Sequence, residues 1–301
     1  MTPQKKATVV SSSVAALLTI LKLIVGIASG SVAVLASAID SVLDMFVSVF
    51  NYFAINNSEK PADATFNYGR GKIEALASVV EGTIISMSGL FLLYEAIKKA
   101  INGETSQYLG ISLTVMIISL IITFLLVVYL NKVAKDTNSM VIKADALHYK
   151  TDVYTNIAVL VSLILVHFTG IELVDVIVGG GISIFIIYSA YELIQEGVLV
   201  LLDRAVDEEI IEEIVKIIES EEKVNTHHLL KTREAGHQTF VEVHLVFNCI
   251  ISLMDAHRVT DRIEDKIKMI NQDREWVINI HMDPYDDLEL NDTGVKSCSI
   301  E

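Results

Sequence analysis

The chain has 301 residues, and 52% of them are hydrophobic. This content disfavours two ordinary soluble domains, because about 20 consecutive apolar residues suffice to cross a bilayer. The formal net charge is −15, and the residues from Leu201 onward contribute −12 of it, with 23 Asp and Glu against 11 Lys and Arg. Such an acidic C-terminal third argues against nucleic acid or anionic lipid as a partner, and suits either a cation-attracting cytosolic domain or simply a soluble acidic one.

Six apolar stretches, separated by short polar or glycine-containing breaks, predict six membrane-spanning helices. They run over residues 8–29, 32–56, 73–98, 108–131, 139–168 and 171–200. All three prolines lie outside these stretches, as expected for uninterrupted helices. The fifth stretch has a polar first half, but a helix that faces the interior of a bundle need not be apolar all round.

The basic residues indicate how the chain crosses the membrane. Eight of them fall on the side that holds the N-terminus and the loops 57–72 and 132–143: Lys5, Lys6, Lys60, Arg70, Lys72, Lys132, Lys135 and Lys143. The opposite side receives only Lys98 and Lys99. Because Lys and Arg concentrate in cytoplasmic loops, we expect a multi-pass protein of the inner (plasma) membrane with both termini in the cytoplasm.

After Leu201 the hydrophobic pattern changes to that of a soluble domain. VDEEIIEEIVKIIES has helical periodicity, HHLLKTRE and QTFVEVHLVFN are typical of strands around the turn EAGH, and a further helix and the strand WVINIHMD follow. The predicted fold is therefore an α-helical membrane protein with six transmembrane helices and a small α+β cytosolic domain of order α-β-β-α-β. We expect domains at 1–204 and 205–288, and a flexible tail at 289–301.

Two pairs of polar residues interrupt the predicted spans. Asp40 and Asp44 in the second span, and His148 and Asp152 in the fifth, are each spaced i, i+4. On a helix such residues share one face, with Cβ atoms about 5–6 Å apart. If the two faces meet, three carboxylates and one imidazole suffice for a tetrahedral divalent cation. Alternatively, each pair forms interhelical hydrogen bonds or lies at a solvated helix end.

With these pairs, the sequence resembles the cation diffusion facilitator family of divalent-metal transporters, of the bacterial zinc and iron efflux type. YGRGKIE at 68–74 and LLDRAVDEE at 201–209 match further segments of that family, and the resemblance covers about residues 8–286. The resemblance implies that Asp40, Asp44, His148 and Asp152 form the transport site. It also implies a homodimer, a metallochaperone-like cytosolic domain and proton-coupled antiport.

Six of the eight histidines lie between His227 and His281. Five residues match the family's cytosolic metal site, which holds two ions: His228, His244, His257, His281 and Asp283. His281 and Asp283 alternate on the last strand and so lie on one face. The alternative is that these histidines merely occupy the surface of a soluble domain, which is how we interpret His227 and His237.

The loop after the second span departs from the family pattern. Where the family has an aspartate and two histidines, this chain has Asp63, Phe66 and Arg70. Arginine is not deprotonated in proteins and cannot bind a cation, so we expect no metal here and an Asp63–Arg70 pair instead. By resemblance, Lys72 and Asp203 form a charge pair, whereas a snorkelling lysine and a helix-end aspartate are the alternative.

Glu81 in the third span and Asp175 in the sixth are further polar intrusions for which the sequence gives no role.

The sequence thus predicts a transporter, not an enzyme, that exports Zn²⁺ or a related divalent cation such as Cd²⁺ or Fe²⁺ in exchange for protons. Because histidine binds metal only in its neutral form, incoming metal displaces a proton. Zn²⁺ is also expected to bind the cytosolic domain as a regulatory ligand. Two other functions stay open: a membrane-anchored metal sensor without transport, and an intramembrane metal-dependent hydrolase. The hydrolase needs an open water position on the metal, which a four-ligand site does not obviously leave.

Overall fold

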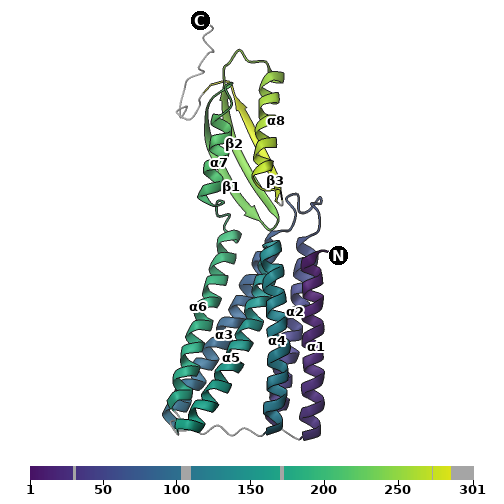
Figure 1. Ribbon diagram of the computed structural model, residues 1–301. Helices are drawn as coiled ribbons and strands as arrows, with labels where there is room; N and C mark the ends of the chain where they lie inside the picture. The colour runs from purple at the N-terminus through teal and green to yellow at the C-terminus, as the bar shows by residue number, and fades with distance from the viewer. Residues whose placement is uncertain (30–31, 103–109, 170–172, 273, 286–301) are drawn as a thin grey trace. The chain divides into compact units, whose positions relative to one another are not determined.

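The computed structural model describes residues 1–29, 32–102, 110–169, 173–272 and 274–285 (Figure 1). The chain divides into two compact units, Met1–Val198 and Leu199–Glu301, each with its own core. The two units are therefore described separately.

All six predicted membrane segments are helical. The described residues of the first unit form α1 (Pro3–Ser29), α2 (Val32–Ser58), α3 (Lys72–Asn102), α4 (Gly110–Thr137), α5 (Met140–Thr169) and α6 (Leu173–Leu201). Among the described residues, stretches of α1, α3, α4 and α6 are long and apolar enough to cross a membrane. The other two helices, α2 and α5, are those that carry the predicted metal ligands.

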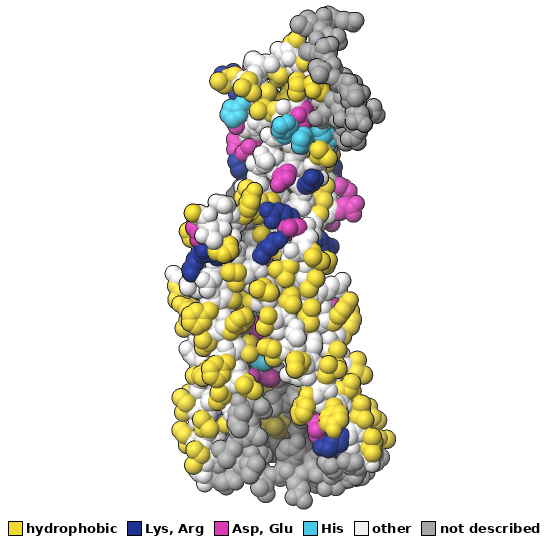
Figure 2. Space-filling view, turned by 180° about the vertical axis from the view of Figure 1, so that it is seen from behind, with side chains coloured by type: hydrophobic (Ala, Val, Ile, Leu, Met, Phe, Trp, Pro, Cys, Tyr) yellow, Lys and Arg dark blue, Asp and Glu magenta, His cyan; other side chains and the backbone are white. Residues whose placement is uncertain are grey.

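The helical unit has apolar side chains both inside and outside. Its core contains Ile55, Leu130, Ile142 and Tyr149, all at most 2% exposed. Large apolar side chains also point outward, as expected for helices whose solvent is lipid. Figure 2 shows hydrophobic side chains over most of the visible surface of these helices. The unit is a helical membrane domain.

Helices α3 and α6 approach closely at glycines. A Cβ atom on Gly82 would lie 2.8 Å from Ile194 of α6, and one on Gly89 would lie 2.9 Å from Ile187. At Gly197 of α6 a Cβ would meet the side chains of Val79 and Ser78 on α3, at 2.7 and 2.8 Å. Small residues at such crossings let the backbones of membrane helices pack tightly.

This packing predicts opposite outcomes for two Gly→Ala changes in α6. We expect Gly197→Ala to destabilise the helical unit by about 1–3 kcal/mol, because its Cβ also comes within 3.0 Å of the backbone oxygen of Ala75. Gly180→Ala is the control, since no atom lies within 4 Å of its added Cβ and alanine favours a helix. Thermal unfolding in detergent measures both changes; equal midpoints for the two variants would contradict the close approach.

The second unit has the predicted α-β-β-α-β order. It consists of α7 (Glu208–Glu219), β1 (Val224–Ala235), β2 (Gln238–Phe247), α8 (Leu253–Ile270) and β3 (Glu275–Asp283). The sheet order is β1-β2-β3, with β1 antiparallel and β3 parallel to β2. Gly236, with φ of 63°, begins the two-residue turn between β1 and β2, where a positive φ suits glycine. The parallel pairing needs a crossover, which α8 provides.

One face of this sheet forms the core of the unit. Alternate residues of β2, among them Val243 and Leu245, pack with Ile214 of α7 and with Val259 and Ile263 of α8. The intervening residues of β2, including His244, therefore lie on the opposite face of the sheet. That second face carries the polar Glu242 and His244 together with the buried Phe240 and Val246.

An ion-pair cluster joins the end of α7 to α8. Glu221 accepts hydrogen bonds from Arg262 at 2.8 Å and from Lys266 at 2.7 Å. These two partners hold the pKa of the Glu221 carboxyl below its ordinary value. Because the folded-state pKa is lowered, this contact stabilises the unit at neutral pH, and its contribution is lost as the pH falls through that pKa.

Candidate metal sites

Helices α2 and α5 bring three of the four predicted transport-site residues together. Asp44 on α2 and His148 and Asp152 on α5 each offer a ligand atom, and these atoms all lie within 4.8 Å of one another. We call these three residues the membrane cluster. Asp40 lies in α2 one turn before Asp44, but its side chain is outside the described residues. The i, i+4 spacing therefore places His148 and Asp152 on one face of α5, opposite Asp44.

The membrane cluster is partly shielded from solvent. The His148 and Asp44 side chains are 13% and 21% exposed, and His148 Nε2 lies 3.1 Å from Asp44 Oδ1. Ionisable groups inside a helical membrane unit are costly, and they are tolerated where they pair or line a cavity. A few acidic and histidine side chains are visible within the hydrophobic surface of the helices in Figure 2.

Neighbouring polar groups hold the cluster in place. Tyr149 is 2% exposed, its hydroxyl shares a 2.8 Å hydrogen bond with Ser48 of α2, and its ring packs edge-on against His148. Lys22 of α1 donates to Ser41 of α2 at 2.7 Å. These contacts between helices were not predicted from the sequence. Ser48 lies four residues after Asp44, so its shared helical face was the available signal.

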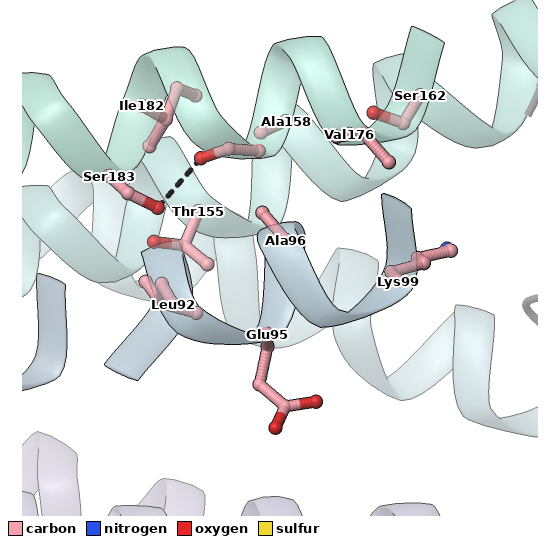
Figure 3. Close-up of a pocket in the computed structure, with 11 residues that line it drawn as sticks. Leu92, Glu95, Ala96, Lys99, Thr155, Ala158, Ser162, Val176, Ile182 and Ser183 are labelled. Carbon is pink, nitrogen blue, oxygen red and sulfur yellow. Dashed lines mark hydrogen bonds between the residues drawn. The ribbon is translucent and has the colours of Figure 1, made fainter. Parts of the chain in front are cut away.

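A cavity of about 240 Å³ lies among α3, α5 and α6 (Figure 3). Its lining includes Thr155, three residues after Asp152 on α5, and the hydroxyls of Ser162 and Ser183. Ser183 donates to the Gly179 backbone oxygen at 2.7 Å, and Figure 3 shows the Glu95 carboxylate turned away from Thr155. The cavity thus adjoins the Asp152 end of the membrane cluster along α5.

In the second unit, three predicted histidines form a row across the sheet. His228 on β1 pairs in register with His244 on β2, and His244 pairs with His281 on β3. The ring centroids of His228 and His244 are 5.0 Å apart, and those of His244 and His281 are 4.6 Å apart. Paired residues of neighbouring strands lie on the same face of a sheet, so the register itself assembles the row.

Asp283 is the centre of this arrangement. Its Oδ2 atom lies 2.9 Å from His244 Nδ1 and 3.4 Å from His228 Nε2, and its Oδ1 atom lies 3.0 Å from His281 Nε2. Ligand atoms of His228, His244 and Asp283 lie within 4.8 Å of one another. We call His228, His244, His281 and Asp283 the cytosolic cluster. Imidazole and carboxylate are ligands that Zn²⁺ and similar cations accept.

The remaining histidines of this unit differ in their surroundings. His257 lies on α8, is exposed, and its Nε2 is 3.7 Å from Asp261 on the same helix. Its predicted part in the cytosolic metal site stays a prediction. His237 is exposed in the turn between β1 and β2, and His227 pairs in register with Leu245. Of these two, only His237 has the exposed position of a surface residue, because His227 is half-buried and its register partner Leu245 belongs to the core.

The loop after α2 holds Asp63 in its own hydrogen bonds. Asp63 Oδ1 accepts from the backbone amides of Thr65 and Phe66, both at 2.9 Å, and Oδ2 accepts from Arg70 at 2.5 Å. The amides of Phe66 and Thr65, and then the Arg70 charge, hold the pKa of Asp63 below its ordinary value. The Arg70 guanidinium also lies 4.3 Å from the centre of the Phe66 ring. These contacts organise the loop around Asp63 and include the predicted Asp63–Arg70 pair.

We therefore expect Asp63→Ala to leave metal flux within about twofold of the parent protein, since surface substitutions away from a site have small effects. Metal uptake by reconstituted vesicles and the number of ions bound per chain measure the outcome. Loss of one bound ion per chain together with a large loss of flux would show that Asp63 binds metal.

The predicted Lys72–Asp203 pair stays a prediction, because the two residues belong to different units. Within the second unit Asp203, at φ of 60°, accepts a hydrogen bond from Arg233 at 3.1 Å. Lys72 begins α3. The side chain of Asp175 lies outside the described residues.

The first unit has long apolar helices around a carboxylate–imidazole cluster, and the small α+β unit has a second such cluster. Together they define a membrane protein that binds metal cations. Residues 8–202 match the family described as cation efflux transmembrane domain, and residues 206–285 match the cytoplasmic domain of cation efflux proteins. The chain belongs to the cation efflux (cation diffusion facilitator) family. This assignment confirms the predicted family.

Relatives that are similar over most of the chain are named as cation-efflux pumps. The chain is 36% identical to the cation-efflux pump FieF of Citrobacter koseri over 262 residues, which cover 87% of each chain. It is 32% identical to that of Serratia proteamaculans over 280 residues, which cover 93% of this chain and 92% of the relative. Among solved structures, the metal-bound C-terminal domain of the CzcD transporter from Thermotoga maritima is 25% identical, covering 25% of this chain and 87% of that one with a TM-score of 0.24.

The family assignment also fixes the class of activity. The chain is a multi-pass membrane transporter for cation efflux, and not an enzyme, as the sequence predicted.

Proposed function

We propose that this transporter exports divalent metal cations from the cytoplasm in exchange for protons, with Zn²⁺ as the preferred cargo and Cd²⁺ or Fe²⁺ as further candidates. The observation that supports it most is the meeting of Asp44, His148 and Asp152 within 4.8 Å inside the helical unit. Asp40 is the proposed fourth ligand. One imidazole and three carboxylates suit Zn²⁺ and similar divalent ions and neutralise their charge.

Proton exchange follows from the chemistry of these ligands. His148 Nε2 and Asp44 Oδ1 lie within hydrogen-bond distance, at 3.1 Å. Metal binding requires a neutral imidazole and ionised carboxylates, so an arriving cation replaces the proton that joins this pair. On the far side of the membrane, a proton that restores the pair helps to release the metal. An inward proton gradient then drives metal outward.

Alternating access connects the cluster to the two sides. In this scheme the helices rock around a site at mid-membrane. The cavity that adjoins Asp152 along α5 is lined by residues 92–99 of α3, near Lys98 and Lys99 on the predicted extracytoplasmic side. We assign the release path to this cavity. The protein is placed in the inner membrane with both termini in the cytoplasm.

The second unit senses cytosolic metal in this proposal. Its cluster of His228, His244, His281 and Asp283, joined by His257, binds Zn²⁺ and strengthens a homodimer. By resemblance to the family, the proposal includes the charge pair of Lys72 and Asp203, and it divides the membrane and cytosolic domains between residues 204 and 205.

The test is uptake into vesicles that contain the purified protein, with Zn²⁺, Cd²⁺, Fe²⁺, Co²⁺, Mn²⁺ and Ni²⁺ compared under an imposed pH gradient. We expect saturable Zn²⁺ flux that depends on the gradient. Metal binding without flux for every ion would favour a membrane-anchored sensor. Flux that is absent together with metal-dependent hydrolysis of a substrate would favour an intramembrane hydrolase.

A further inference from the structure

Three polar side chains meet inside the helical unit without any assigned role. Asn51 of α2, Glu81 of α3 and Asp145 of α5 are all at most 1% exposed. The Asn51 Nδ2 atom donates to Glu81 Oε2 at 3.0 Å and to Asp145 Oδ1 at 3.3 Å. One amide thus bridges two buried carboxylates from two other helices. We call these three residues the buried triad.

Each member of the buried triad keeps an oxygen with nothing to bind it. Among the described residues, Asn51 Oδ1, Glu81 Oε1 and Asp145 Oδ2 are buried and have no hydrogen-bond partner. A buried polar atom without a partner costs free energy, and the cost is larger for a charged group. Three such atoms on side chains already in contact indicate an electropositive ligand that completes them.

The surroundings of the triad do not supply that ligand. The hydroxyls of Ser11 and Ser48 lie beside Asp145, but Ser11 donates to the Thr8 backbone oxygen at 3.1 Å and Ser48 is bonded to Tyr149. The His148 imidazole is near enough to both carboxylates to interact with them electrostatically, but its Nε2 atom lies 3.1 Å from Asp44 Oδ1. Within the described part of the chain, neither triad carboxylate pairs with a lysine or an arginine.

The triad lies along the same helix faces as the membrane cluster. Asp145 is three residues before His148 on α5, and Asn51 is seven residues after Asp44 on α2, so each pair shares a helix face. In both helices the step from cluster to triad leads toward a loop predicted to be cytoplasmic, 132–143 or 57–72. An ion that travels from the cytoplasm along these faces meets the triad first.

We propose that Asn51, Glu81 and Asp145 form a second cation site, which a divalent cation occupies on its way to the membrane cluster. All its ligands are oxygen atoms, which suit ions such as Mn²⁺ or Mg²⁺, whereas the imidazole of the membrane cluster suits Zn²⁺. A half-turn of the Asn51 amide replaces the bridging nitrogen by Oδ1, so the side chain donates to the carboxylates when the site is empty and binds the ion when it is filled. The inference depends on the proposed transport function only for the direction from which the ion arrives.

Binding of Mn²⁺ to the full-length protein in detergent, followed by the electron paramagnetic resonance signal of free Mn²⁺, tests this site. We expect Glu81→Gln to weaken binding of one Mn²⁺ per chain by at least about tenfold. Loss of a supporting partner around a metal already lowers metal affinity about 10–100-fold. Glu192→Gln is the matched control, because Glu192 is also a glutamate of a membrane helix, α6, and is exposed. It should bind Mn²⁺ as the parent does.

A second substitution separates a cation site from a purely structural bridge. Asn51→Asp keeps an oxygen ligand but removes the amide donor. A cation site keeps or gains Mn²⁺ affinity in this variant, whereas Mn²⁺ affinity that is lost in Asn51→Asp would show that the triad is a structural bridge dependent on the amide N–H groups.

Unchanged Mn²⁺ binding in Glu81→Gln, with Zn²⁺ binding still lowered by Asp152→Ala, overturns the second site and leaves the transport site standing. Zn²⁺ binding that Asp152→Ala does not alter, with Mn²⁺ binding still weakened by Glu81→Gln, overturns the transport site alone.

Discussion

Asp152→Ala is expected to reduce Zn²⁺ flux to the level of vesicles without protein. Asp152 and His148 occupy one face of α5 opposite Asp44, and their ligand atoms lie within 4.8 Å. Without Asp152 the cation loses a ligand and the site loses a negative charge. Because the loss of even a supporting partner around a metal costs 10–100-fold in affinity, we expect flux to fall by at least about 100-fold. Asp44→Ala should have the same effect, since it also removes the partner of His148.

Asp136→Ala is the matched control for this prediction. Asp136 is also an aspartate of a membrane helix, at the exposed end of α4. Uptake of Zn²⁺ by vesicles is measured for the three variants at equal protein content, after gel filtration has shown that each is folded. Normal Zn²⁺ transport by either Asp44→Ala or Asp152→Ala would refute the assignment of the transport site.

The second large effect concerns the cytosolic unit, which should gain stability from metal. Residues 205–290 contain a complete core around Val243, Ile214 and Ile263, so this fragment is expected to fold alone. An ion that binds only the folded form stabilises it by about 2.7 kcal/mol when its free concentration is a hundred times the dissociation constant. Zn²⁺ at that excess should therefore raise the unfolding midpoint by about 11–22 °C, since each kcal/mol shifts the midpoint of a domain of this size by about 4–8 °C.

The stabilisation should depend on pH and on Asp283. Since histidine binds metal only as the neutral imidazole, the shift at pH 7.5 should shrink at pH 5.5. Asp283 contacts His228, His244 and His281, so Asp283→Ala should remove more stabilisation than one ligand of one ion supplies. His237→Ala, in an exposed turn, is the control and should change little. An unchanged midpoint on adding Zn²⁺ at pH 7.5 would show that the histidine row does not bind Zn²⁺.

Hydropathy and helical spacing were enough to predict the helices and the pairing within each of them. The i, i+4 spacing of His148 and Asp152 determines that they share a face of α5, whatever the rest of the fold does. The alternation of β2 likewise predicts that Val243 and Leu245 share one face of the sheet and that His244 lies on the other. In these cases the geometry of a single element carries the information.

Arrangements between elements could not be predicted from the sequence alone. The row of His228, His244 and His281 depends on the register of three strands, and β1 has an irregular pairing after His228, where Leu229 takes a φ of 51°. The buried triad depends on how three helices are rotated about their axes. Asn51 gave no signal beyond its place seven residues after Asp44, and Glu81 appeared only as a charge in an apolar span.

The central claim, exchange of a divalent cation for protons at the membrane cluster, is tested most directly by following both ions at once. Vesicles that contain the protein, a Zn²⁺ indicator and a pH indicator are exposed to external Zn²⁺ while the membrane potential is held at zero. We predict that Zn²⁺ entry is accompanied by proton exit in the parent protein, and that both signals disappear together in Asp152→Ala. Zn²⁺ entry without any proton movement, or equal signals from the parent and Asp152→Ala, would contradict the proposal.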